Sequence, residues 1–94
     1  MSQQDVYVAK MKLQIDELNA ELKTLEAKAK EARRDVKAQY DEQMDKVREQ
    51  SRLASAKLDE LSTAAEGSWD KMVADMEKLR NAFTSSFHYF KSQV

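Results

Sequence analysis

The sequence predicts an all-helical protein, and three observations support that fold class. The 94 residues include no proline and one glycine, whereas a β-rich fold needs turn residues about every 8 to 12 positions. Charged residues make up 35% of the chain and hydrophobic residues 41%, a balance typical of long helices and coiled coils. Apolar residues recur at alternating spacings of three and four, which predicts a helical stripe that faces a partner helix.

The first expected helix covers about residues 4–64 and carries most of this stripe. Around Tyr40 two successive spacings of four interrupt the alternation, which we interpret as local unwinding within a continuous helix. We call the stripe of this helix the seam and predict that it forms an oligomer interface. The seam comprises Val8, Met11, Ile15, Leu18, Leu22, Leu25, Val36, Met44, Val47, Leu58 and Leu61.

A break between two helices is predicted near Gly67. Small polar residues cluster around this glycine in residues 62–68, and glycine commonly follows a helix end because it tolerates a left-handed backbone. Ser68 is a favoured residue at a helix N-terminus, and Asp70 would lie in the first turn of the next helix. The alternative is an uninterrupted helix with one weak point, since glycine costs about 1 kcal/mol relative to alanine.

The second expected helix covers about residues 68–92 and has an aromatic character. Its apolar side chains share one face, opposite residues such as Asp70, Lys71 and Lys78. Such a face either packs against the first helix or lies in a membrane interface, although the polar face is not rich in basic residues. We call it the C-terminal apolar face: Trp69, Met72, Met76, Leu79, Phe83, Phe87 and Phe90.

The predicted hairpin, a single domain over residues 1–94, is too thin to cover its own seam. A helix over residues 5–61 would be about 85 Å long, and the second helix would reach back only about 38 Å. Residues 8–36 would then expose an apolar stripe to water, so we expect self-association as a coiled coil or helical bundle. A homodimer is the first expectation and a tetramer the second.

The charge balance argues against nucleic-acid binding. Sixteen basic and seventeen acidic residues leave a formal net charge of −1, without the basic excess that phosphate contacts require. The densest basic stretch, residues 28–37, has Glu31 and Asp35 threaded through it. It is read as a solvated helix face, with a docking patch for an acidic protein partner as the alternative.

Few residues suit catalysis or metal binding. The chain has no cysteine and one histidine, His88, so a zinc site is not expected. Met72 and Met76 share a helix face and could bind Cu(I), but core filling is the simpler interpretation. Carboxylate pairs such as Asp41 and Asp45 lack the dry cleft that acid–base catalysis needs. We therefore expect a protein without cofactors that is not an enzyme.

Two segments resemble a known group of proteins. Residues 7–21 (YVAKMKLQIDELNAE) and 64–72 (AAEGSWDKM) are similar to small bacterial proteins described only as coiled-coil domain-containing, whose repeats look loosely like apolipoprotein helices. The resemblance implies a bacterial cytoplasmic helical protein. A polar N-terminus without a secretory signal and the lack of a long apolar run lead to the same expected location.

The sequence supports two functional hypotheses. The first is a structural or interaction protein that self-assembles through the seam and serves as a scaffold, adaptor or filament unit. The second is a peripheral lipid-binding, stress-protective protein that uses residues 69–94 as a membrane face.

Overall fold

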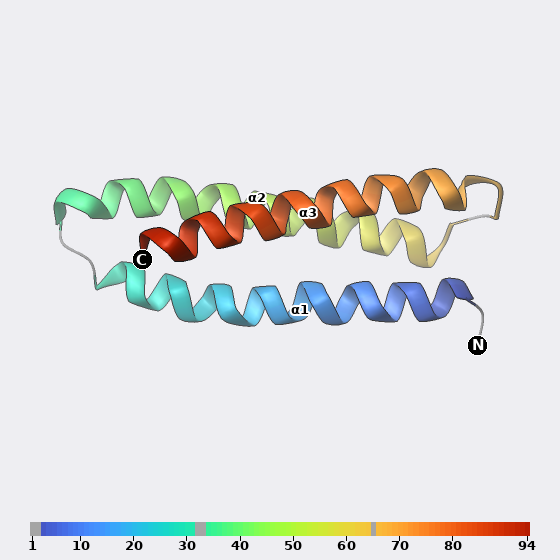
Figure 1. Ribbon diagram of the computed structural model, residues 1–94, viewed down its shortest axis with the longest axis horizontal. Coiled ribbons are helices and arrows are strands. Elements are labelled where there is room, and N and C mark those ends of the chain that lie inside the picture. The colour runs from blue at the N-terminus through green and yellow to red at the C-terminus, as the bar shows by residue number, and fades with distance from the viewer. Residues whose placement is uncertain (1–2, 32–33, 65) are drawn as a thin grey trace.

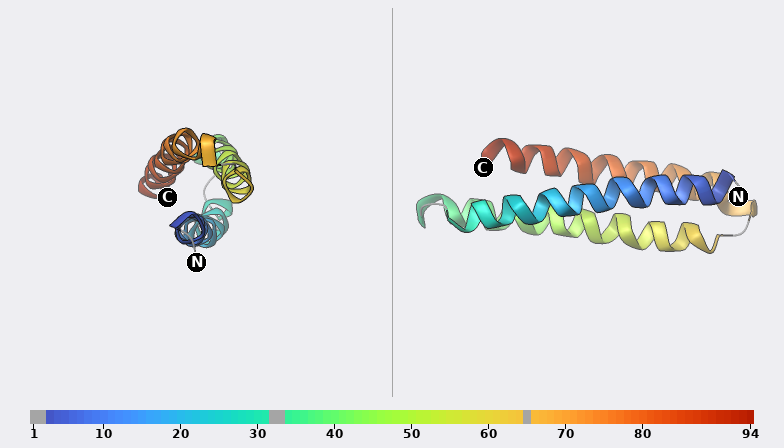
Figure 2. Two further views of the ribbon diagram at one scale, coloured as in Figure 1. Left: turned by 90° about the vertical axis from the view of Figure 1, so that its right-hand side faces the viewer. Right: turned by 90° about the horizontal axis from the view of Figure 1, so that it is seen from below.

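Three α-helices run back and forth along one rod in the computed structural model, which describes residues 3–31, 34–64 and 66–94 (Figure 1). Helix α1 comprises Gln3–Lys30, α2 comprises Arg34–Ser62 and α3 comprises Trp69–Gln93, with a 3-10 turn, η1, at Glu66–Ser68. The rod measures 50 × 20 × 17 Å, and the three helices form a triangle in the view along it (Figure 2). The described residues contain no strand, so the predicted all-helical class is confirmed.

The predicted extent of the first helix is wrong, because the range 4–64 contains two antiparallel helices rather than one. Helix α1 ends at Lys30, and α2 begins at Arg34 and runs back along α1. Residues 32 and 33 lie outside the described part of the chain. The irregularity around Tyr40 lies within α2 and is helical, as predicted.

Burial explains why the chain folds back without a glycine or proline at the turn. A turn gives up about four backbone hydrogen bonds, each worth about 1 kcal/mol net. Folding back buries whole side chains of α1, such as Ile15 at 2% exposed and Leu22 at 4%. Each such side chain contributes about 1.5–3 kcal/mol, so burial outweighs the lost bonds. Lys28 and Lys30 in the last turn of α1 and Asp35 in the first turn of α2 also suit the helix dipoles.

The second turn lies where the sequence predicted a break, but for a different backbone reason. Helix α2 ends at Ser62 and α3 begins at Trp69, close to the predicted start at residue 68. Gly67 does not have a positive φ, so the left-handed conformation inferred for it is absent. Ser68 immediately precedes α3, but its side chain makes no capping hydrogen bond. The hydroxyls of Ser62 and Thr63 instead donate to backbone carbonyls at the end of α2.

The core lies along the axis of the rod and takes residues from all three helices. Most of the seam is buried there within a single chain, since α2 and α3 cover the inward face of α1. The expectation that residues 8–36 expose an apolar stripe is therefore wrong, and with it the argument that a second copy must cover the seam. The buried residues are Met11, Ile15, Leu22, Leu25, Ala29, Met44, Val47, Ala54, Leu58, Leu61, Met76, Phe83, Phe87 and Phe90.

The C-terminal apolar face also points into the core. Phe83 and Phe90 are completely buried, while Trp69, Met72 and Leu79 are partly buried against the same cluster. This face packs against the other helices of the chain, which was one of the two interpretations of its pattern. Within the described ranges, no helix is both long enough and apolar enough to cross a bilayer.

Candidate interaction surface

The structure brings the predicted seam and the predicted C-terminal apolar face together in one interior. On the seam, Val8 and Leu18 are partly buried and pack against the core, whereas Val36 is half-buried outside the core cluster. The other seam residues, Met11, Ile15, Leu22, Leu25, Met44, Val47, Leu58 and Leu61, are buried. Neither predicted surface is therefore available to a partner in the closed bundle, and a candidate interaction surface has to lie elsewhere.

A group of polar contacts holds α1 against α3. The Tyr7 hydroxyl donates to Glu77 Oε1 at 2.7 Å, and Arg80 pairs with Glu77 at 2.6 Å while also donating to Gln14 at 3.2 Å. The Tyr7 ring meets Trp69 edge-on, with centroids 5.8 Å apart. Burial, followed by the hydrogen bond and charge of Glu77, raises the pKa of Tyr7 well above its usual value. These contacts fix one flank of α1.

The other flank of α1 is fixed by two polar contacts to α2. Arg48 Nε donates to Glu26 Oε1 at 2.8 Å, and the Ser51 hydroxyl donates to Asn19 Oδ1 at 2.6 Å. The hydrogen bond and charge of Glu26 raise the pKa of Arg48. Among the described residues, helix α1 is thus held from inside and from both flanks, and its outward face points to solvent.

The outward face of α1 carries a column of apolar side chains. Val6 is 55% exposed and Leu13 is 60% exposed, and both are among the large apolar residues that the fold leaves in solvent. Ala20 and Ala27 continue the column at the same seven-residue spacing and are also exposed. We call these four residues the outer column. Because they recur every seven residues, they lie on one side of the helix over about 32 Å, in a line that shifts by only about 20° around the axis from each residue to the next.

The outer column faces directly away from the bundle. At about 100° per residue, Leu13 lies roughly 160° around α1 from buried Ile15 and Met11. Figure 2 shows α1 at one corner of the triangle, with α2 and α3 on the opposite side of it. A second molecule can therefore approach the outer column without displacing any helix.

Two opposite charges lie along one edge of the outer column. Lys10 and Glu17 are seven residues apart and both exposed, so they repeat the spacing of the column about 40–60° to one side of it. Among the described residues, neither belongs to any of the ion pairs. Asp16 is exposed on the other edge. The face therefore combines an apolar centre with a defined pattern of charge.

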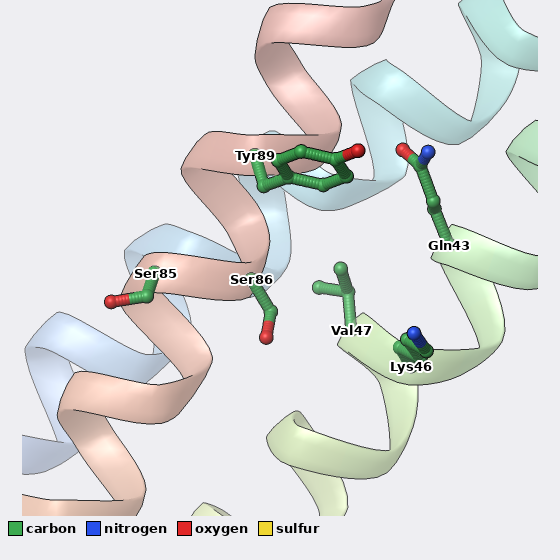
Figure 3. Close-up of a pocket in the computed structure, with 6 residues that line it drawn as sticks. All are labelled: Gln43, Lys46, Val47, Ser85, Ser86 and Tyr89. Atoms are coloured by element: carbon green, nitrogen blue, oxygen red, sulfur yellow. The ribbon is translucent and has the colours of Figure 1, made fainter.

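A shallow depression between α2 and α3 is the alternative surface (Figure 3). It has a volume of about 290 Å³, and the ring of Tyr89 reaches across it from α3 toward Gln43 on α2. Gln43 Oε1 is buried and accepts no hydrogen bond from the described residues. The lining is mixed: Tyr89, which is 60% exposed, and Val47 are apolar, whereas Gln43, Lys46, Ser85 and Ser86 are polar. The depression therefore has a single large exposed apolar side chain, whereas the outer column has two in line.

The surface offers little to a metal or a reacting group. Among the described residues, no three side chains of His, Cys, Asp or Glu come close enough together to hold a metal ion. His88 is exposed, and its ring meets Phe87 edge-on at 5.6 Å. Asp41 and Asp45 are exposed on α2, while Met72 and Met76 belong to the interior.

Sequence reasoning missed the outer column because it followed the longer stripe inside the bundle. The signal was the spacing of Val6, Leu13, Ala20 and Ala27, which repeats every seven residues opposite the seam. Comparison of the chain with protein-family models, with curated proteins and with solved structures finds no match. The resemblance to bacterial coiled-coil proteins stays a prediction.

Proposed function

We propose that this chain is a non-enzymatic interaction protein that self-associates through the outer column of α1. The observation that carries the proposal is the exposure of Val6 and Leu13, at 55% and 60%, in line with exposed alanines. Apolar residues at seven-residue spacing on a helix surface pack well against a second helix. The bundle supplies a rigid support for this face, because α1 is held on its other three sides.

A binding role is favoured over a catalytic one by the distribution of polar side chains. The core of the described residues contains no buried polar or charged side chain. Catalytic groups need a dry cleft that shifts their pKa values, and the depressions on the rod are open and shallow. The charged surface suits a scaffold or adaptor that meets other molecules through its sides.

The small size of the outer column predicts weak association. Even if paired along the full length of the column, about 32 Å, one helix against another buries less than about 1,200 Å² in total, which is typical of transient complexes. We therefore expect a dimer with a dissociation constant of about 50–200 μM. Such an equilibrium suits a protein that assembles when its local concentration rises.

The test is sedimentation equilibrium over a range of protein concentrations, with one variant on the outer column and one matched control. Leu13→Glu removes an apolar contact from both copies, which costs about 2 kcal/mol, or about 30-fold in the dissociation constant. Tyr89→Glu changes a side chain of the same 60% exposure on α3 and is expected to leave association unchanged. Circular dichroism checks that both variants remain helical.

Three results would contradict the proposal. Wild-type protein that is monomeric up to about 500 μM would show that the outer column does not mediate self-association. Equal association of wild type and Leu13→Glu would place the interface elsewhere. Loss of association in Tyr89→Glu alone would assign the interface to the depression between α2 and α3.

A further inference from the structure

We infer that two copies pair α1 against α1 in antiparallel orientation, with a two-fold axis passing beside Leu13. The inference rests on the proposed self-association and adds the orientation and the register of the two helices. It follows from the order of residues along the outer column and from the charges at its edge. Two-fold symmetric interfaces are self-complementary, so each contact occurs twice.

The apolar contacts fit this register. A two-fold axis beside Leu13 sets Leu13 against Leu13 of the second copy and Val6 against Ala20 of the second copy. The two leucines thus meet each other at the centre, and each valine meets a small alanine at either end, while Ala27 lies beyond the paired part of the column. Helix axes about 8–10 Å apart accommodate such layers, and α2 and α3 lie on the opposite side of α1.

The charges also fit this register. Lys10 precedes Leu13 by three residues and Glu17 follows it by four, and both lie on the same edge of the column. An antiparallel two-fold brings equivalent edges together, so Lys10 lies within about 1.5 Å, measured along the axis, of Glu17 of the second copy. Two identical ion pairs then flank the central leucines.

Three alternative arrangements place like charges together. An antiparallel pair centred between Val6 and Leu13 sets the two copies of Lys10 side by side. One centred between Leu13 and Ala20 does the same with the two copies of Glu17. In a parallel pair, one edge of the column meets the opposite edge of the second copy. Glu17 then lies beside Asp16 of the second copy, and Lys10 lies beside Ala9 of the second copy. An antiparallel register centred on Ala20 also pairs opposite charges, Lys10 with Glu31 and Asp16 with Lys23 of the second copy, but it leaves Val6 without an apolar partner. The register centred on Leu13 combines paired charges with apolar contacts for both Val6 and Leu13, and charge pairing of this kind sets orientation between helices.

Charge exchange tests the ion pairs. Lys10→Glu alone and Glu17→Lys alone each create two like-charge contacts, and each is expected to weaken self-association at least tenfold. The double variant restores opposite charges and is expected to return within about threefold of wild type. An equimolar mixture of the two single variants is expected to form a heterodimer at concentrations where neither associates alone.

Disulfide cross-linking tests the register. Because the chain has no natural cysteine, only the introduced cysteines can form a disulfide. Leu13→Cys is expected to form a cross-linked dimer on mild oxidation. Val6→Cys alone is expected to stay uncross-linked, because the antiparallel register holds its two copies about 21 Å apart. An equimolar mixture of Val6→Cys and Ala20→Cys is expected to cross-link.

The outcomes separate this inference from the proposed function. If Leu13→Glu abolishes association but the double charge variant stays as weak as the single ones, self-association stands and this register is wrong. Efficient cross-linking of Val6→Cys with itself would likewise overturn the antiparallel orientation. Association that is unaffected by Leu13→Glu would overturn both proposals together.

Discussion

Replacing Ile15 with alanine tests whether one chain covers its own seam. Ile15 is 2% exposed between the three helices, and truncating a buried isoleucine costs about 2–5 kcal/mol through lost burial and the cavity left behind. The whole fold of 94 residues is expected to be stable by about 5–14 kcal/mol. A loss of about 3 kcal/mol therefore removes a large part of the stability without abolishing the fold.

The assay is urea unfolding followed by circular dichroism at about 5 μM protein, below the expected dimer dissociation constant. With a slope of about 1.5 kcal/mol per molar urea, the Ile15→Ala midpoint is expected to fall by about 2 M. Leu13→Ala is the matched control, since Leu13 is 60% exposed on the same helix. Its midpoint is expected to change by less than about 0.5 M, because exposed substitutions usually have small effects.

A seam that formed an interface between chains would couple unfolding to dissociation. The urea midpoints of wild type and Ile15→Ala would then both rise with protein concentration even well below the dissociation constant expected for the outer-column dimer, since mass action favours the complex. Such a dependence, or a Leu13→Ala effect as large as that of Ile15→Ala, would refute the reasoning from a self-contained bundle.

Three further substitutions can be measured in the same way. Gly67→Ala is expected to stabilise the protein by about 0.4–1 kcal/mol, because Gly67 lacks a positive φ and a Cβ there meets no atom within 4 Å. A loss of stability would contradict this backbone conformation of Gly67. Phe83→Ala is expected to cost about 3–5 kcal/mol, since Phe83 is fully buried, and a change under about 1 kcal/mol would show that this helix face is not core. Tyr7→Phe is expected to cost about 1 kcal/mol at neutral pH by removing the hydrogen bond to Glu77. The folded state raises the pKa of Tyr7, so the unfolded chain loses this proton first and the free energy of unfolding falls as pH rises above about 10. Tyr7→Phe has no such proton and should lose less stability over that range. An equal loss of stability in both proteins would argue against the contact.

The sequence was informative about helices and about which of their faces are apolar. Composition predicted the helical class, and the small polar residues around Gly67 located the turn between α2 and α3. Helical periodicity also identified side chains such as Ile15 and Phe83 that are buried in the structure. These properties depend on local sequence, which is why they could be predicted.

The turn between α1 and α2 could not be predicted from local signals. It contains neither glycine nor proline, and the apolar stripe continues across it in phase from Ala29 to Val36. The gain that favours the turn comes from packing α1 against helices far along the chain, and periodicity carries no information about that packing. A seven-residue repeat is equally compatible with helices of one chain and helices of two. The sequence therefore predicted an interface between molecules at residues that form the interior of one.

The placement of Trp69 gives the protein a built-in optical reporter of one specific event. It is the single tryptophan of the chain, and its ring contacts Tyr7 across the boundary between α1 and α3. Detachment of α1 would expose the indole to water and shift its emission to longer wavelength. Pairing of two molecules through the opposite side of α1 would leave that emission unchanged, so intrinsic fluorescence can distinguish opening of the bundle from assembly.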